Sequence, residues 1–305
     1  MSTTCTSPDL RERRMHRLTV PLLVALLCLV WGSTWWAIRV CLHDQPPLSS
    51  AALRFCLAGL VMAAVARRLA RLETAPPPPQ WLWMTTGVTN FAGSYGLLYV
   101  AETFVPSGIA AVLWAVFPLL MATSAVLFLG ERLRSRQLAG FVVSFLGIVT
   151  VFAGALESIG QQSLGWLLLL LASPVVSATG TTLVKKYGSG ASSVLLNRNG
   201  MLLGALLLSA AAFLREDPLG MAWTWQAVVA TLYLALFGTA LTFGIYFWLL
   251  RTAPASMLSL ISYVTPVLAM LLAAAVGDGE TNGGLWLGTA LVVTGVALVV
   301  VKPRP

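Results

Sequence analysis

The sequence predicts an all-α integral membrane protein in which ten transmembrane helices form two inverted five-helix repeats around a central cavity. Three observations support this prediction: an apolar composition, apolar runs that alternate with basic loops, and a duplication at one constant offset. The chain of 305 residues is 58% hydrophobic and only 10% charged, whereas soluble domains carry about 25% charged residues. Apolar runs of about 20 residues recur along the chain, and a helix of this length crosses a bilayer.

The apolar runs divide the chain into ten expected spans with short connections. They cover residues 18–40, 48–66, 82–103, 107–129, 135–153, 163–184, 191–213, 225–249, 255–276 and 283–301. Residues 1–17 form a basic segment before the first span. Because the run from Leu18 continues without a small-residue cleavage site, the sequence favours a retained first helix over a cleaved signal peptide.

Lys and Arg residues gather in alternate connections, and this asymmetry orients the spans. With the N-terminus in the cytoplasm, every cytoplasmic segment is basic: residues 11–17, 67–71, 132–136, 185–186, 251 and 302–304. The loops on the other side hold only Arg215, next to two acidic residues. Since cytoplasmic loops carry an excess of Lys and Arg, we expect a multi-pass plasma (inner) membrane protein with both termini cytoplasmic. The basic residues behind the net charge of +8 then set the orientation of the spans in the membrane, and no nucleic-acid partner is expected.

Landmarks recur at a constant offset of 148 residues. The matched pairs are Pro106 and Pro254, Pro118 and Pro266, Gly96 and Gly244, Gly140 and Gly288, and Gly147 and Gly295. The two expected repeats, residues 18–153 and 163–301, hold five spans each. Because five is odd, the second repeat crosses the membrane in the opposite sense to the first. Inverted repeats are typical of secondary transporters, whose two halves surround a shared site.

Pro118 and Pro266 fall near the middle of the fourth and ninth expected spans. A proline inside a helix removes one backbone hydrogen bond, and an unpaired carbonyl at that depth is tolerated where it lines a wet cavity or is buried in protein. We expect matched helix interruptions at these prolines, beside a central site. Kinks that serve only packing are the alternative. Pro106 and Pro254 lie at expected helix starts, where proline fits well.

Aromatic and weakly polar residues follow helical spacing on several expected spans, so that they share faces. The candidate substrate-binding residues are Trp31, Thr34, Trp35, Tyr95, Tyr99, Trp114, Pro118, Ser259, Ser262, Tyr263 and Pro266. Such a lining suits an amphipathic or zwitterionic solute with an apolar side chain, and suits a phosphate poorly. Tryptophans that merely pack or anchor at the interface are the alternative.

Three of the charged residues that fall within or at the edge of expected spans are candidates for gating or coupling: Arg54, Glu102 and Arg198. Charge inside a bilayer is costly and points to function by default. Each arginine is a candidate for binding a substrate carboxylate or for holding a gate shut, with snorkelling to the interface as the alternative. Glu102 is a candidate carrier of a coupling proton if it is buried, and a solvated helix end otherwise.

Several stretches resemble the EamA family of the drug/metabolite transporter superfamily. They include "WGSTWWAIR", "LRFCLAG", "GIAAVLWAVFPLL" and, in the second half, "SLISYVTPVLAMLLA" and "LGTALVVTGVALV". The resemblance covers nearly the whole chain beyond residue 17 and implies a ten-helix fold, a central cavity and export of metabolites, amino acids or toxic compounds. One departure is "GDGETNGG", which lacks the basic cluster of "GERLRSRQ". That loop is expected outside, where few positive charges belong.

The sequence therefore predicts a secondary active or facilitative transporter of a small amphipathic metabolite, such as an amino acid, that exports it by alternating access. A membrane receptor or scaffold that binds a ligand without moving it is the alternative. No GxxxxGK[ST], HExxH or GxSxG motif occurs, so neither ATP-driven pumping nor enzyme activity is expected. We expect no cofactor, no metal and free cysteines. The partners are a small-molecule substrate and the lipid bilayer; a coupling proton, uniport and a homodimer are left open.

Overall fold

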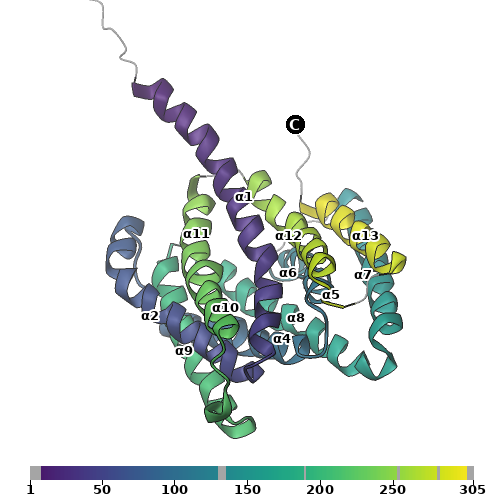
Figure 1. Ribbon diagram of the computed structural model, residues 1–305. Coiled ribbons are helices and arrows are strands. Elements are labelled where there is room, and N and C mark those ends of the chain that lie inside the picture. Colours follow the sequence, from purple (N-terminus) through teal and green to yellow (C-terminus); the bar gives the residue numbers. More distant parts are fainter. Residues whose placement is uncertain (1–7, 130–134, 189, 253–254, 280–281, 301–305) are drawn as a thin grey trace, which may run out of the picture.

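The computed structural model describes residues 8–129, 135–188, 190–252, 255–279 and 282–300 (Figure 1). Every regular element in these ranges is helical and none is a strand, which confirms the all-α prediction. The α-helices are α1 (Pro8–Leu42), α2 (Pro47–Glu73), α3 (Gln80–Thr86), α4 (Tyr95–Glu102), α5 (Ser107–Trp114), α6 (Phe117–Leu129), α7 (Ser135–Ile159), α8 (Leu164–Tyr187), α9 (Ser193–Arg215), α10 (Trp225–Ala235), α11 (Thr242–Thr252), α12 (Ala255–Val276) and α13 (Gly283–Val300). Two π-helical segments, η1 (Gly87–Ser94) and η4 (Leu236–Leu241), and two 3₁₀ turns, η2 (Gln161–Ser163) and η3 (Pro218–Gly220), complete the list.

Seven helical segments of the described ranges are long and apolar enough to cross a membrane. They are Thr19–Leu42, Pro47–Arg71, Ser107–Phe128, Ser135–Ile159, Gln161–Tyr187, Ser193–Arg215 and Trp225–Tyr246, and two shorter apolar helices cover Val264–Val276 and Gly283–Val299. Large apolar side chains face outward on several of them, among them Leu127, Phe145 and Leu206, each at least 65% exposed. Apolar surface of this extent is typical of contact with lipid or with another protein.

The buried core draws on both halves of the chain. Phe55 on α2, Tyr99 on α4, Leu113 on α5 and Leu234 on α10 are fully buried. Figure 1 shows α1 running beside α12, and α7 beside α13, so that helices distant in sequence are neighbours in space. The first turns of α1 extend beyond the rest of the bundle.

The expected third span, residues 82–103, is helical but changes its winding midway. The elements α3, η1 and α4 follow one another from Gln80 to Glu102 without a break. This run is not among the seven segments above, since Thr85, Thr86, Thr89 and Asn90 reduce its apolar character. Shifted by the offset of 148, η1 overlaps η4. Both π-helical segments therefore occupy matching places in the two halves, and such segments are frequent at functional sites.

Helices α7 and α13 approach closely through the glycines that the 148-residue offset relates. Gly140 lies against Gly295, and Gly147 lies against Gly288. A Cβ atom added at Gly147 would stand 2.8 Å from the Gly288 carbonyl oxygen, and one added at Gly140 would stand 2.7 Å from that of Gly295. Because the residue number rises along α7 while that of its contact on α13 falls, the two helices run antiparallel. Small residues permit this backbone contact, as in many membrane helix pairs.

Helices α2 and α9 cap each other through two glutamates. Glu216, just after α9, accepts hydrogen bonds at the start of α2 from the Leu48 N–H at 2.8 Å and from the Ser49 N–H at 2.9 Å. Glu73, at the end of α2, accepts from the Val194 N–H at the start of α9 and from the hydroxyls of Ser192 and Ser193. A carboxylate satisfies the unpaired N–H groups of a helix N-terminus and is favoured there by the helix dipole. The pair is therefore antiparallel and fastened at both ends.

The expected matched interruptions at the two prolines occur in one half only. The helix stops at Trp114, and α6 begins at Phe117, so Pro118 occupies the first turn of α6 rather than mid-helix. A proline in a first turn removes no intrahelical hydrogen bond. By contrast, α12 continues through Pro266. The prediction of a second interruption at Pro266 is therefore wrong, and that proline is accommodated within an unbroken helix.

Candidate functional site

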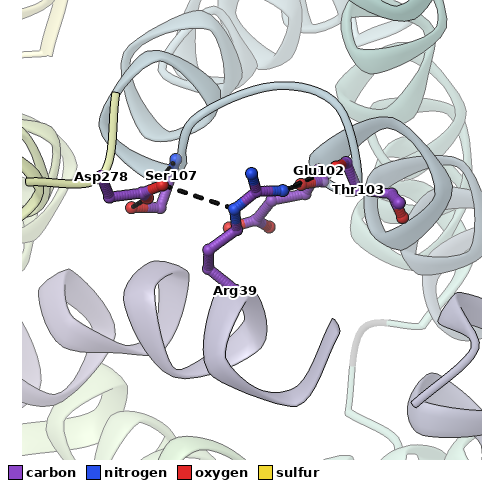
Figure 2. Close-up of polar contacts among 5 residues, drawn as sticks. All are labelled: Arg39, Glu102, Thr103, Ser107 and Asp278. Carbon is purple, nitrogen blue, oxygen red and sulfur yellow. Dashed lines mark hydrogen bonds and ion pairs between the residues drawn. The ribbon is translucent and has the colours of Figure 1, made fainter. Parts of the chain in front are cut away.

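Arg39 in the last turn of α1 connects three other parts of the chain (Figure 2). Its Nε lies 3.4 Å from Oδ1 of Asp278, in the turn after α12. Its Nη1 donates to the carbonyl oxygens of Glu102 at 2.7 Å and Thr103 at 2.6 Å, at the end of α4. Oδ2 of Asp278 accepts from both the backbone N–H and the hydroxyl of Ser107, the first residue of α5. We name Arg39, Glu102, Thr103, Ser107 and Asp278 the Arg39 cluster.

The local sequence explains how Asp278 reaches this position. Gly277 and Gly279, which flank Asp278, have φ values of +71° and +89°, a left-handed backbone that glycine adopts at little cost. A Cβ atom at Gly279 would stand 2.6 Å from Cγ of Pro106, so the turn packs directly on the start of α5. The Asp278 carboxylate thereby meets the N-terminal end of α5, where a negative charge is favoured.

The Arg39–Asp278 ion pair is largely shielded from solvent. The Arg39 side chain is 25% exposed and that of Asp278 is 11% exposed. A shielded ion pair is stable only when further hydrogen bonds satisfy both partners, and here the two carbonyls and Ser107 do so. Removing either charge would leave the other poorly paired, so the cluster holds its four segments together as a unit.

Glu102 contributes a second carboxyl group to the Arg39 cluster. Its side chain is fully buried, and neither carboxyl oxygen has a hydrogen-bond partner among the described residues. The charges of Asp278, Arg39 and Arg54 all act on it. The alternative of a solvated helix end is therefore wrong. Buried polar groups without partners are rare in proteins, and each requires a physical explanation.

Arg54 on α2 lies buried between α4 and η4. Its Nε donates to Oγ1 of Thr239 at 3.0 Å, its Nη1 donates to the hydroxyl of Tyr99 at 3.2 Å, and its Nη2 makes a longer contact of 3.5 Å with the Gly238 carbonyl. The ring of Tyr95 lies 5.0 Å from the guanidinium carbon, within cation–π range. Arg54 is only 3% exposed, so it does not snorkel. Within the described ranges no carboxylate lies at ion-pair distance from it.

Several predicted aromatic residues meet around this arginine and along α1. Tyr95 packs edge-on against Phe55 at 4.8 Å between ring centroids. The rings of Trp35 and Trp114 are 6.3 Å apart, and the Trp114 indole donates to Oγ of Ser173 at 3.1 Å. Trp31 instead contacts Tyr246 on α11, at 5.5 Å. Two groups thus form, with Tyr95 and Tyr99 at Arg54 and Trp35 against Trp114.

Of the remaining predicted residues, Thr34 lies near Arg54, since a Cβ atom added at Gly238 would stand 2.8 Å from Cγ2 of Thr34 and 3.8 Å from Nη2 of Arg54. Thr34 is buried and its hydroxyl donates to the Trp31 carbonyl. Arg198 on α9 is partly buried and donates through Nε and Nη2 to the side-chain oxygen of Asn199. Ser262 on α12 is partly buried. The side chains of Ser259 and Tyr263 lie outside the described part of the chain.

An apolar groove of about 320 Å³ lies elsewhere, between α1, α2, η4 and α11. It is lined by Leu23, Leu69, Ala240, Leu241, Gly244 and Ile245. None of the predicted binding residues lines it, and its apolar walls differ from the aromatic, weakly polar lining that the sequence predicts. The groove therefore does not correspond to the predicted central cavity.

Sequence reasoning missed Ser107, Asp278 and Thr239. Asp278 directly follows an apolar run and stands between two glycines, a pattern that marks an acidic turn at a span end. That signal could have drawn attention to it. Its pairing with Arg39, 239 residues away, has no counterpart in local sequence.

Comparisons with known proteins agree with this architecture. The EamA-like transporter family model matches residues 18–153 and 164–301. The chain is 31% identical over 291 residues to "Uncharacterized inner membrane transporter YedA" of Escherichia coli K12, covering 93% of this chain and 92% of the relative. It is 31% identical over 288 residues to "Probable amino-acid metabolite efflux pump" of Salmonella typhimurium LT2, covering 90% and 92%.

A solved structure supports the fold as well. A crystal structure described only as that of a protein matches with a TM-score of 0.66 at 22% identity, covering 92% of this chain and 96% of the other. At that identity the likeness concerns the fold alone. The family match, by contrast, spans nearly the whole sequence. The chain belongs to the EamA-like transporter family.

Proposed function

We propose that this protein is a secondary transporter that exports a small amphipathic metabolite across the inner membrane by alternating access. The names of its relatives support this reading: one is named an inner membrane transporter and one a probable amino-acid metabolite efflux pump. The many apolar helices support a multi-pass position in the bilayer. Both termini face the cytoplasm, by the distribution of Lys and Arg.

The proposed architecture is ten spans in two inverted repeats, and three features support it. The π-helical segments η1 and η4 coincide under the 148-residue offset. Helices α7 and α13, which the same offset relates, pack antiparallel through Gly147 and Gly288. A glutamate at the end of each of the helices α2 and α9 caps the start of the other. Antiparallel packing of matched helices is what two repeats of opposite orientation produce.

The observation that carries the proposal is the Arg39 cluster. Arg39, Glu102, Thr103 and Ser107 come from the first half of the chain, whereas Asp278 comes from the second. By the predicted orientation the cluster lies at the outer ends of its helices. Contacts between the halves at one membrane face close that face, while the solute enters from the other. The arrangement fits a transporter closed to the outside.

The solute site that we propose lies deeper, around Arg54. The guanidinium would hold a carboxylate, and Tyr95, Tyr99, Trp35 and Trp114 would pack against an apolar side chain. Arginine binds carboxylates through paired N–H groups, and Arg54 is buried without an acidic partner in the described ranges. An amino acid with an apolar side chain has both chemical features.

Flux into proteoliposomes tests the proposal. Vesicles that contain the protein should take up radiolabelled apolar amino acids in a saturable manner, and protein-free vesicles should not. A receptor or scaffold would bind the same solutes saturably without any flux. Saturable binding with no flux, in either vesicle orientation, would overturn the transport proposal in favour of the receptor.

A further inference from the structure

The Glu102 side chain has no role in the contacts that hold the Arg39 cluster together, although it lies inside it. Its backbone carbonyl accepts from Arg39, but its carboxyl oxygens bind nothing in the described part of the chain. In Figure 2 the Glu102 carboxyl group and the Arg39 side chain are drawn in the same cluster, and no ion pair joins them. Of the two acidic residues in the cluster, Arg39 forms an ion pair with only one, Asp278.

We propose that Glu102 is a proton-binding site that selects the partner of Arg39, and so couples opening of the outer face to the loss of one proton. This inference rests on the proposed transport function. With its proton bound, Glu102 is neutral and does not compete for Arg39. Arg39 then pairs with Asp278, and the cluster is closed as observed. When the proton passes to water, the Glu102 carboxylate competes for Arg39, and Asp278 loses its cationic partner.

The backbone contacts of Arg39 limit the movement that this exchange requires. Arg39 Nη1 already touches the carbonyls of Glu102 and Thr103 at 2.7 and 2.6 Å, so the guanidinium is anchored at the end of α4 in both states. Only its Nε side, which faces Asp278 at 3.4 Å, needs to turn. Of the polar contacts of Asp278, those to Ser107 would then remain, and α12 could move away from α1.

Other charged and titratable groups around Glu102 shape the switch. Asp278 faces it from the turn after α12, Arg39 and Cys41 from α1, Arg54 from α2, and Tyr99 from its own helix. A bare carboxylate without hydrogen bonds or solvent is costly in such a place, which is why a proton occupies it in the closed arrangement. An uptake of this proton from outside, after the solute has left, would close the outer face. Release of the proton to the cytoplasm while the inner face is open, followed by its uptake from outside, would move one proton inward per cycle, so that a proton gradient directed inward would drive export.

A thiol reporter below the cluster tests the proposal without any solute. Ala111 lies one turn beyond Ser107 on α5 and is buried, so an A111C thiol should react with a membrane-impermeant maleimide only when the outer face opens. Because the thiolate fraction itself rises with pH, labelling is divided by that of a Q162C variant, at an exposed position. The protein with native cysteines only gives the background.

The normalised labelling of A111C should rise at least about fivefold between about pH 6 and pH 8, since one linked proton shifts an equilibrium by up to about tenfold per pH unit. Adding Glu102→Gln should give low labelling at both values, and Glu102→Asp should keep the pH response. Glu157→Gln, at an exposed acidic residue on α7, should change nothing. A full pH response in the Glu102→Gln protein would overturn the proposal.

A second variant keeps the test decisive if Glu102→Gln fails to fold. Arg39→Gln retains both carboxyl groups but removes the group that they share, so the pH response should disappear. Its persistence would equally overturn the proposal. The outcome also separates the two proposals: pH-dependent labelling without solute flux would defeat only the transport function, and flux with pH-independent labelling would defeat only the proton switch.

Discussion

Gly147 of α7 lies against Gly288 of α13, with no room for a side chain between the two backbones. The 148-residue offset relates these two helices to each other, and Gly140 lies opposite Gly295 in the same interface. Antiparallel packing of a helix on its counterpart is what the proposed pair of oppositely oriented repeats would produce. The interface therefore offers a direct test of how much the close approach contributes to stability.

Replacing Gly147 by Ala should destabilise the protein by about 1–3 kcal/mol, the usual cost of overpacking. The added Cβ would stand 2.6 Å from the Val292 nitrogen, so one helix must shift. Gly165→Ala on α8 is the matched control, because no atom lies within 4 Å of its added Cβ. Thermal unfolding in detergent measures both, and equal unfolding temperatures would argue against a tight α7–α13 contact.

The reciprocal caps predict a second, independent loss of stability. Glu216→Ala removes the acceptor for two N–H groups at the start of α2, and should cost about 1–2 kcal/mol, as the loss of a helix cap does. Glu157→Ala, at an exposed position on α7, should leave the unfolding temperature unchanged. If Glu216→Ala behaves like that control, the carboxylate contributes nothing to the α2–α9 pair.

Much of this fold follows from sequence because apolar length and periodicity determine helices directly. The depth of Arg54 and the burial of Glu102 at a helix end are harder to predict from sequence, because hydropathy does not show which face of a helix packs against protein. The sequence predicts both residues as functional candidates but leaves a snorkelling alternative for Arg54 and a solvated alternative for Glu102, and the burial of both side chains excludes these alternatives.

Other features lie beyond what periodicity can resolve. A π-helical segment such as η1 differs from α-helix by a single inserted residue, which leaves the apolar pattern nearly unchanged. Pro118 and Pro266 are equivalent in sequence, but only the first lies at a helix start. The difference depends on packing around each proline. The Arg39–Asp278 pair joins distant segments, so only the folded chain reveals it.

Arg54→Gln should weaken the binding of a solute that carries a carboxylate by about tenfold to a hundredfold, the equivalent of one charge-assisted hydrogen bond. The amide of the same solute should bind equally to both proteins, because it lacks the charge. Arg198→Gln is the control, since Arg198 contacts only the neighbouring Asn199 among the polar contacts described. Solute-dependent shifts in unfolding temperature measure these affinities. An equal loss for acid and amide would indicate that Arg54 is structural.

Trp114→Ala should reduce solute flux by about twofold to tenfold while leaving expression intact, as the loss of an aromatic contact of about 0.5–1.5 kcal/mol implies. Trp114 packs beside Trp35 and its indole N–H donates to Ser173, so Trp114→Phe should retain more flux than the alanine variant. Trp225→Ala provides the control, because Trp225 is 76% exposed at the start of α10. Initial rates of uptake into proteoliposomes, normalised to protein content, measure the three variants. Wild-type flux in Trp114→Ala would show that the solute path avoids the contact between α1 and α5.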